Sequence, residues 1–290
     1  MAAVLVAAAV VATGASALSG AGGNGQRADR AAILLAWDEG RHDDVFAMTG
    51  EALAARPLDF FLLTMRGFSA YQAGVSRIDG MEARGLFDDS VRVLRQALLL
   101  RESDGDPRIP YVLGKAYFQL GDGFADLAVA FLERAADMGH RASDIPEFLG
   151  LAHAALGDHE SSVIAFARAL EISRPSALLL LSMAQSYVAL GEYAKARAYL
   201  VRAVGVSADS RVTLASRLLL ADVLGRTGDV DGAIAQIAEV IEEGGDSAEA
   251  RFRLGELHAM RGDNIRARAE WRSAVAIDPA HLGARSRLAL

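Results

Sequence analysis

Cysteine is absent from this chain of 290 residues. Without it the chain can form no disulfide, no thiolate nucleophile, no cysteine-ligated zinc site and no lipidated N-terminal cysteine. Proline is also scarce, with six residues, so few positions interrupt a helix. Together with a hydrophobic content of 52%, rich in alanine and leucine, this composition favours an all-helical protein and argues against disulfide scaffolds and thiol enzymes.

Basic residues are outnumbered by acidic ones. The chain has 30 basic and 37 acidic residues, a formal net charge of −7, and only two lysines, Lys115 and Lys195. Binding to a phosphate backbone requires concentrated positive charge. We therefore expect no nucleic-acid partner.

Glycine recurs at a regular interval. It occupies positions 40, 74, 121, 157, 191, 228 and 262, which are separated by 34, 47, 36, 34, 37 and 34 residues. A base period of this length is typical of repeat proteins built from paired helices. In the last unit, Gly262 follows one apolar helical pattern and Pro279 ends the next, which predicts helix, tight turn, helix, stop.

The same register fits seven units. A large side chain of the second helix is expected to lie between small residues where neighbouring helices cross. The large positions are Thr49, Leu94, Leu132, Phe166, Leu200, Ile237 and Trp271. The preceding small positions are Val45, Ser90, Ala128, Ser162, Ala196, Ala233 and Ala267, and the first helices supply Gly67, Gly114, Gly150, Ala184, Ala221 and Gly255.

At these positions the chain resembles the tetratricopeptide repeat (TPR) family over residues 26–281. The aromatic position of the first helix is Tyr117 and Tyr187 in two units but His153 and His258 in two others, and the closing proline survives as Pro57 and Pro279. The resemblance implies an all-α fold, a right-handed α-solenoid of about seven helix–turn–helix repeats. Their expected ranges are 26–59, 60–106, 107–142, 143–176, 177–213, 214–247 and 248–281.

Two irregularities interrupt the array. The second unit carries about eleven extra residues, 75–85, between its helices, and we expect these to project as a loop that either contacts a partner or is a tolerated long turn. At the other end, residues 282–290 restart the first-helix pattern and then stop. This half-unit is expected to be a partial capping helix over the last repeat.

The N-terminal region lacks charge altogether. Residues 1–25 open with an apolar run and pass through Ala15-Ser16-Ala17 into glycine-rich sequence, which predicts a signal or anchor segment over 1–19 and a flexible linker over 20–25. As an uncleaved transmembrane helix, residues 1–18 would extend ~27 Å, slightly short of the ~30 Å hydrocarbon core. As a cleaved signal, the segment has an A-x-A site but lacks the positive residues expected ahead of it.

These alternatives give opposite locations for the repeats. Arg27 and Arg30 are the first basic residues after the apolar run, so the positive-inside rule places the array in the cytoplasm if the segment is an anchor. A cleaved signal would make the protein periplasmic or exported. A mis-set start or a capping helix is a third interpretation of the same residues.

The sequence contains few candidates for a catalytic, phosphate-binding or metal-binding site. Residues 20–25 formally satisfy G-x-G-x-x-G, but no strand–turn–helix unit surrounds them. Gly114-Lys115 lacks the upstream glycine and the following Ser or Thr of a phosphate-binding loop, and the six histidines show no metal-ligand spacing. No nucleophile, base and orienting group occur together. We therefore expect no enzyme activity, no cofactor and no metal.

The family resemblance implies that binding residues come from the concave face formed by the first helices. In register, the groove residues are Trp37, Phe61, Phe68, Tyr71, Tyr111, Lys115, Phe118, Leu151, Leu178, Leu181, Gln185, Asp222, Arg226, Phe252 and Glu256. An apolar, partly aromatic groove suits an extended apolar peptide or an amphipathic helix. Internal packing of these side chains, or their cover by the N-terminal segment, is the alternative.

We expect a non-enzymatic scaffold or adaptor that binds protein or peptide ligands and is membrane-associated or exported. An accessory subunit of a cell-envelope enzyme, or of an assembly or secretion complex, is the second interpretation. The chaperone-tail clamp of some TPR proteins is not expected, because the chain's asparagines, Asn24 and Asn264, lie outside the groove.

Overall fold

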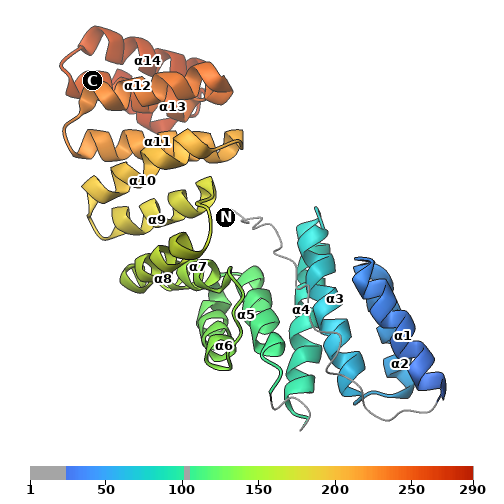
Figure 1. Ribbon diagram of the computed structural model, residues 1–290. Coiled ribbons are helices and arrows are strands. Elements are labelled where there is room, and N and C mark those ends of the chain that lie inside the picture. Colours follow the sequence, from blue (N-terminus) through green and yellow to red (C-terminus); the bar gives the residue numbers. More distant parts are fainter. Residues whose placement is uncertain (1–23, 101–104, 290) are drawn as a thin grey trace. The chain divides into compact units, whose positions relative to one another are not determined.

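The computed structural model describes residues 24–100 and 105–289, with side chains from residue 29 onward (Figure 1). Within these ranges the regular structure is helical throughout and contains no strand, and the helices follow one another as antiparallel pairs. The chain divides into two compact units, residues 1–158 and 159–290. The division falls between the two helices of the predicted repeat 143–176.

Unit 1 contains the first seven α-helices. They are α1 (Asn24–Asp38), α2 (His42–Ala55), α3 (Phe60–Ser76), α4 (Gly80–Leu98), α5 (Arg108–Leu120), α6 (Ala125–Asp137) and α7 (Ile145–Ala155), with a short 3-10 turn, η3 (Asp122–Phe124), before α6. Successive helices pack on one another from α1 to α7. The core therefore runs along the stack instead of gathering at one centre.

Unit 2 repeats the arrangement with eight helices. They are α8 (His159–Ile172), α9 (Ala177–Ala189), α10 (Tyr193–Val206), α11 (Ser210–Arg226), α12 (Val230–Val240), α13 (Ala248–Met260), α14 (Asn264–Ile277) and α15 (Leu282–Leu288), with a π-helical turn, η4 (Ile241–Gly245), after α12. The short α15 packs on α14 and buries Ala284 completely.

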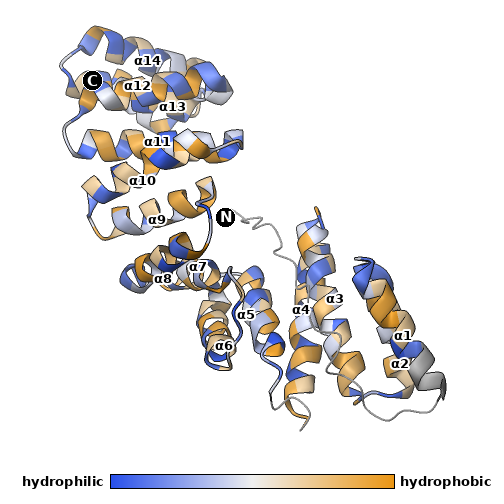
Figure 2. Cartoon of the chain, in the orientation of Figure 1, coloured by the Kyte–Doolittle hydropathy of each residue, from blue (hydrophilic) through white to orange (hydrophobic). Residues whose placement is uncertain are grey.

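The packing register expected from the sequence is confirmed. Every large position of the second helices is buried, from Thr49 and Leu94 at 0% exposure to Trp271 at 7%. The small residues opposite them are required: an added Cβ at Gly114 would lie 2.6 Å from Leu132 Cγ, and one at Gly255 would lie 2.4 Å from Trp271 Nε1. The described helices each carry hydrophobic and hydrophilic residues (Figure 2), as expected where one side packs and the other meets water.

Six of the seven regularly spaced glycines end a first helix in the left-handed conformation, with φ from +73° at Gly40 to +107° at Gly121. At Gly191 (φ +74°), the amide of the next residue, Glu192, donates to the carbonyl of Tyr187 at 2.9 Å and closes the end of α9. An L-residue with a side chain adopts this conformation at a cost, whereas glycine does not.

Replacing Gly191 by alanine is therefore expected to lower the free energy of unfolding of unit 2 by about 1 kcal/mol. Gly205 is the matched control, because it lies in α10 without a positive φ and with no atom near an added Cβ. Gly205→Ala should raise stability by about 0.5 kcal/mol. Urea denaturation followed by Trp271 fluorescence in a Trp37→Phe background measures both, and equal responses would contradict the assigned turn.

The second predicted repeat, residues 60–106, corrects one expectation. Gly74 does not form a turn but lies inside α3, where an added Cβ would be 2.7 Å from Phe87 Cε1. Most of residues 75–85 belong to lengthened helices: α3 ends at Ser76, and α4 starts at Gly80 behind the N-cap Asp79, whose carboxylate accepts from the Met81 amide. The predicted loop is thus a three-residue turn at the tip of a longer helical pair, with Ile78 and Met81 exposed there.

The predicted signal or anchor segment, residues 1–19, lies outside the described residues. Of the predicted linker 20–25, Asn24 and Gly25 form the first turn of α1. In the ranges that the structure describes, no helix combines the length and the apolar character that crossing a membrane requires.

Candidate functional site

The first helices of the repeats form the layer in which binding residues are expected. In unit 1, α3 contacts α5 and α5 contacts α7; in unit 2, α9 contacts α11. The predicted groove residues all lie on these first helices or on α1 and α13. Their exposure differs sharply between the two units.

In unit 1 the centre of this layer is a buried ion pair. Lys115 on α5 lies 2.7 Å (Nζ to Oδ2) from Asp144, the residue that precedes α7, and the Lys115 side chain is 3% exposed. Tyr111, one turn before Lys115, donates its hydroxyl proton to Asp144 at 2.8 Å and accepts from Lys115 Nζ at 3.0 Å. We call Tyr111, Lys115 and Asp144 the Lys115 cluster. It connects α5 to the start of α7.

Aromatic rings surround the ammonium group. Lys115 Nζ lies 4.6 Å from the ring centroid of Phe148, 4.9 Å from that of Tyr111 and 5.4 Å from that of Tyr71. The faces of these rings attract a cation, and the carboxylate supplies the opposite charge. Lys115 is thus occupied within unit 1 and does not project toward solvent.

Burial dominates the titration behaviour near the cluster. It raises the pKa of Tyr111 and of Tyr71 above the ordinary tyrosine value, and the negative charge of Asp144 adds to both shifts. It also raises the pKa of Glu147, with Asp144 again contributing, and lowers the pKa of His140. All these directions follow from the cost of placing a charge where water is excluded.

The predicted groove residues fall into three groups by exposure. Buried in the structure are Phe61, Phe68, Tyr71, Tyr111, Lys115 and Leu181; half-buried are Trp37, Phe118, Leu151, Leu178, Phe252 and Glu256; exposed are Gln185, Asp222 and Arg226. Adjacent first helices pack on one another within the buried group, as where Lys115 Nζ of α5 lies 5.4 Å from the ring centroid of Tyr71 of α3. That all of them contact a partner stays a prediction.

In unit 2 the same layer is hollowed. A groove of about 320 Å³ lies between α11 and α13, and we call it the α11–α13 groove. It is lined by Ala221, Asp222, Gly225, Arg226, Ile237, Arg253, Glu256, Leu257 and Met260. Its floor is apolar and buried, with Ile237 at 1% and Leu257 at 8% exposure, whereas Met260 at its end is 61% exposed.

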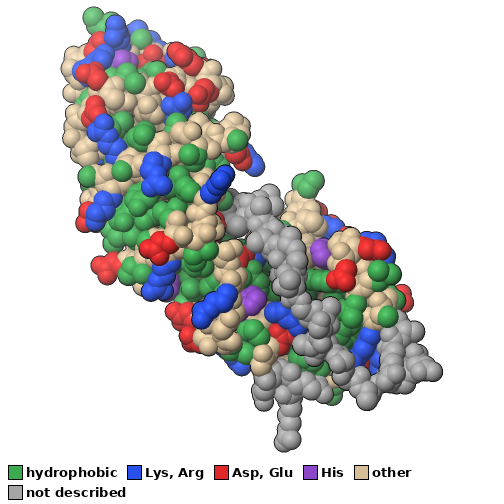
Figure 3. Space-filling view, in the orientation of Figure 1, with side chains coloured by type: hydrophobic (Ala, Val, Ile, Leu, Met, Phe, Trp, Pro, Cys, Tyr) green, Lys and Arg blue, Asp and Glu red, His purple; other side chains and the backbone are tan. Residues whose placement is uncertain are grey.

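Gly225 keeps this groove open. A Cβ at Gly225 would lie 3.5 Å from Leu257 Cδ2, so any longer side chain would extend into the hollow. Charged side chains of both signs are spread over the visible surface of unit 2, where hydrophobic side chains gather over α9 (Figure 3). The lining residues of the groove itself include buried Ile237 and Leu257 together with four charged residues, so the groove combines apolar area with polar groups, as binding clefts do.

Four charged side chains line the groove, and three of them are paired. Asp222 lies 3.6 Å from Arg253, and Glu256 accepts from Arg287 of α15 at 2.6 Å. Arg226, the last residue of α11, has its guanidinium 5.9 Å from the ring centroid of Tyr193. Among the described residues, no carboxylate lies within ion-pair distance of Arg226.

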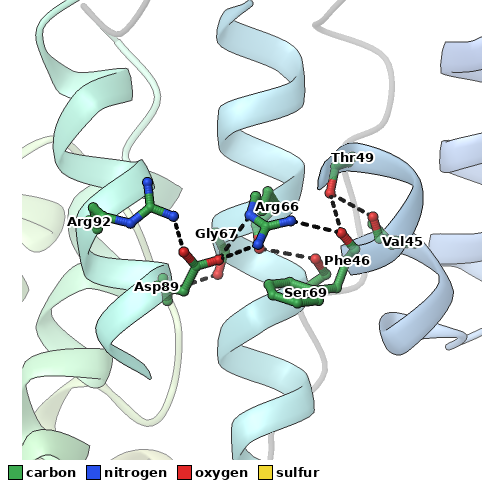
Figure 4. Close-up of polar contacts among 9 residues, drawn as sticks. Val45, Phe46, Thr49, Arg66, Gly67, Ser69, Asp89 and Arg92 are labelled. Carbon is green, nitrogen blue, oxygen red and sulfur yellow. Dashed lines mark hydrogen bonds and ion pairs between the residues drawn. The ribbon is translucent and has the colours of Figure 1, made fainter. Parts of the chain in front are cut away.

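A second hollow lies in unit 1, and its arginines, unlike Arg226 among the described residues, have a carboxylate partner. It measures about 400 Å³ and is lined by residues of α2, α3 and α4, including Arg66 and Arg92. Both arginines pair with Asp89, and Arg66 also donates to the Phe46 carbonyl at 3.1 Å and lies 4.0 Å from the Phe46 ring centroid (Figure 4). Its charged groups join three helices.

Asp144, Arg253, Leu257 and Met260 were not expected from the sequence. Asp144 lies at a repeat junction, where aspartate is ordinary turn chemistry, and only its spacing before the first helix of the next repeat could have marked it. The other three lie on α13 in register with Glu256, which was expected. In the described ranges no group of three or more His, Asp or Glu residues is placed to hold a metal ion.

Paired antiparallel helices, glycine-ended first helices and a shared packing register define a helical repeat protein. Family models described as tetratricopeptide repeat match residues 111–177, 177–210 and 218–281, which together are more than half of the chain. The chain belongs to the tetratricopeptide repeat family. No curated protein matches it.

Solved structures share the fold at low sequence identity. The C-terminal part of a TPR protein from Cytophaga hutchinsonii is 14% identical, with a TM-score of 0.66 over 88% of this chain and 98% of that one. YrrB, a TPR protein with an unusual peptide-binding site, is 20% identical, with a TM-score of 0.58 over 69% and 100% of the two chains. PilW, a type IV pilus biogenesis factor, is 15% identical, with a TM-score of 0.60 over 77% and 98%.

Proposed function

We propose that this chain is a non-catalytic scaffold that binds a segment of a partner protein in the α11–α13 groove. The observation that carries the proposal is the groove itself: a buried apolar floor under a charged rim, on the first helices of unit 2. Apolar floors supply affinity and polar rims supply orientation in protein interfaces. Family membership adds support, because TPR domains typically serve as interaction scaffolds.

The groove favours an apolar or amphipathic partner segment. Ile237 and Leu257 offer a floor for one large apolar side chain, and the exposed thioether of Met260 can adapt its shape to that side chain. The aromatic layer of unit 1 has a structural role within the scaffold instead of a binding role, because the Lys115 cluster and the rings around it hold helices together.

Photo-crosslinking from the groove tests this function. A benzoylphenylalanine at position 260 of the full chain, expressed in its native host, is expected to capture a partner protein. The same group at the matched control Ile265, 86% exposed on α14, should not capture it. Excess unlabelled chain should compete for the crosslink, and excess Gly225→Met chain, whose groove is filled, should compete poorly.

Identical crosslinks from both positions, or competition by the Gly225→Met chain as strong as by the natural chain, would contradict the proposal. Circular dichroism of the Gly225→Met chain provides the folding control.

The proposal includes membrane association or export through residues 1–19, supported by their uncharged, apolar composition. A second candidate function is that of an accessory subunit of an envelope assembly or secretion complex. The shared fold with PilW, a type IV pilus biogenesis factor, favours this candidate. The two functions differ in the identity of the captured partner, which would be an envelope enzyme or assembly component in the second case.

A further inference from the structure

The unpaired arginine at the rim carries information about the partner. We infer that the α11–α13 groove selects a protein segment in which an acidic side chain lies next to a large apolar one, with Arg226 binding the carboxylate. This inference rests on the proposed function, since it names the chemistry of the segment bound in the same groove.

The pairing of charges at the rim is the first argument. The four charged residues that line the groove are Asp222, Arg226, Arg253 and Glu256. Both carboxylates are already paired, Asp222 with Arg253 at 3.6 Å and Glu256 with Arg287 at 2.6 Å. Arg253 has a second acidic partner, Glu249, at 2.6 Å. Of the four lining residues, Arg226 is the one for which the described part of the chain holds no carboxylate at ion-pair distance.

The position of Arg226 is the second argument. It is the last residue of α11, where the partial negative charge of a helix C-terminus favours a cation. Gly225 beside it carries no side chain, and its neighbours Ala221 and Leu257 are buried. Arg226 itself is exposed, so its guanidinium can reach a bound segment without breaking an existing ion pair.

The third argument concerns the strength of the interaction. An ion pair in open solvent contributes little, whereas one formed beside an apolar floor is less screened by water. The guanidinium also presents several donors in one plane, which suits bidentate binding of a carboxylate. A basic segment would instead meet an unpaired like charge, which disfavours it.

Selection from a display library of linear peptides tests the inference. The full chain, its Arg226→Glu variant and its Arg272→Glu variant serve as baits; Arg272 is an exposed arginine on α14 and provides the matched charge reversal. Peptides are assigned to the groove when the Gly225→Met substitution abolishes their binding. Kd values of the selected peptides are then measured for each variant.

Groove-bound peptides are expected to carry Asp or Glu next to a large apolar residue. Their Kd should rise about five- to tenfold with Arg226→Glu, in line with a partly shielded ion pair turned into a repulsion. It should change less than about twofold with Arg272→Glu. Selection on the Arg226→Glu chain should enrich Lys or Arg at the same position.

Two failures are distinguishable. If peptides bind in the groove but show no acidic preference, or respond equally to Arg226→Glu and Arg272→Glu, the acidic selectivity is wrong and the groove function stands. If no selected peptide is sensitive to Gly225→Met, both the groove function and the inference drawn from it are wrong.

Discussion

Replacing Lys115 by methionine is expected to lower the free energy of unfolding of unit 1 by about 3–5 kcal/mol, the cost of breaking a buried ion pair from one side. The Lys115 side chain is 3% exposed, and Asp144 lies 2.7 Å away. Methionine keeps most of the volume but leaves the Asp144 charge without its cation. The effect is measured by urea denaturation followed by Trp37 fluorescence in a Trp271→Phe background.

The chain supplies its own control, because Lys195 is its only other lysine. Lys195 pairs with Glu192 at 3.4 Å, with side chains 56% and 51% exposed. Lys195→Met should therefore cost less than about 1 kcal/mol. Adding Asp144→Asn to Lys115→Met should recover part of the loss, because no buried charge is then left unpaired. Equal costs for the two lysines would overturn the structural role of the cluster.

The second large effect concerns the contact between α5 and α6. Gly114→Ala is expected to destabilise unit 1 by about 2–3 kcal/mol through overpacking. The added Cβ would lie 2.6 Å from Leu132 Cγ and 3.0 Å from both the Ala128 carbonyl oxygen and the Leu132 amide nitrogen. Because two of these atoms belong to the backbone, a rotamer change cannot relieve the contact, and the helices must separate.

Gly85→Ala is the matched control for this change. Gly85 lies within α4 with no atom within 4 Å of an added Cβ, so alanine there should stabilise unit 1 by up to about 1 kcal/mol. Trp37 fluorescence reports both variants during denaturation. If Gly114→Ala were also stabilising, α5 and α6 would not cross as closely as the structure has them.

The repeat register could be predicted because each packing position is occupied by a residue of the required size in almost every unit. Gly74, which the spacing predicts to form a turn but which lies inside α3, shows the limit of this reasoning. Spacing cannot distinguish a glycine needed for a left-handed turn from one needed for close packing, here against Phe87. For the same reason the spacing predicts a loop for residues 75–85, whereas most of them lengthen α3 and α4.

The candidate site was predicted less completely. Register alone placed Asp222, Arg226 and Glu256 on the first-helix face, and the structure has all three at the α11–α13 groove. It could not show that Tyr111 and Lys115 are buried, because their burial depends on Asp144, which lies 29 residues from Lys115 at a repeat junction. Which first-helix residues stay open depends on how closely the next helix packs.

Hydroxyl-radical footprinting tests the central claim, that a partner segment occupies the α11–α13 groove, most directly. The full chain is oxidised alone and with the partner captured from position 260. Met260, 61% exposed at the groove, and Met81, 84% exposed at the tip of the α3–α4 pair, are two reactive methionines within one sample. The account predicts that the partner protects Met260 and leaves Met81 unchanged. Unchanged oxidation of Met260 in the complex would contradict it.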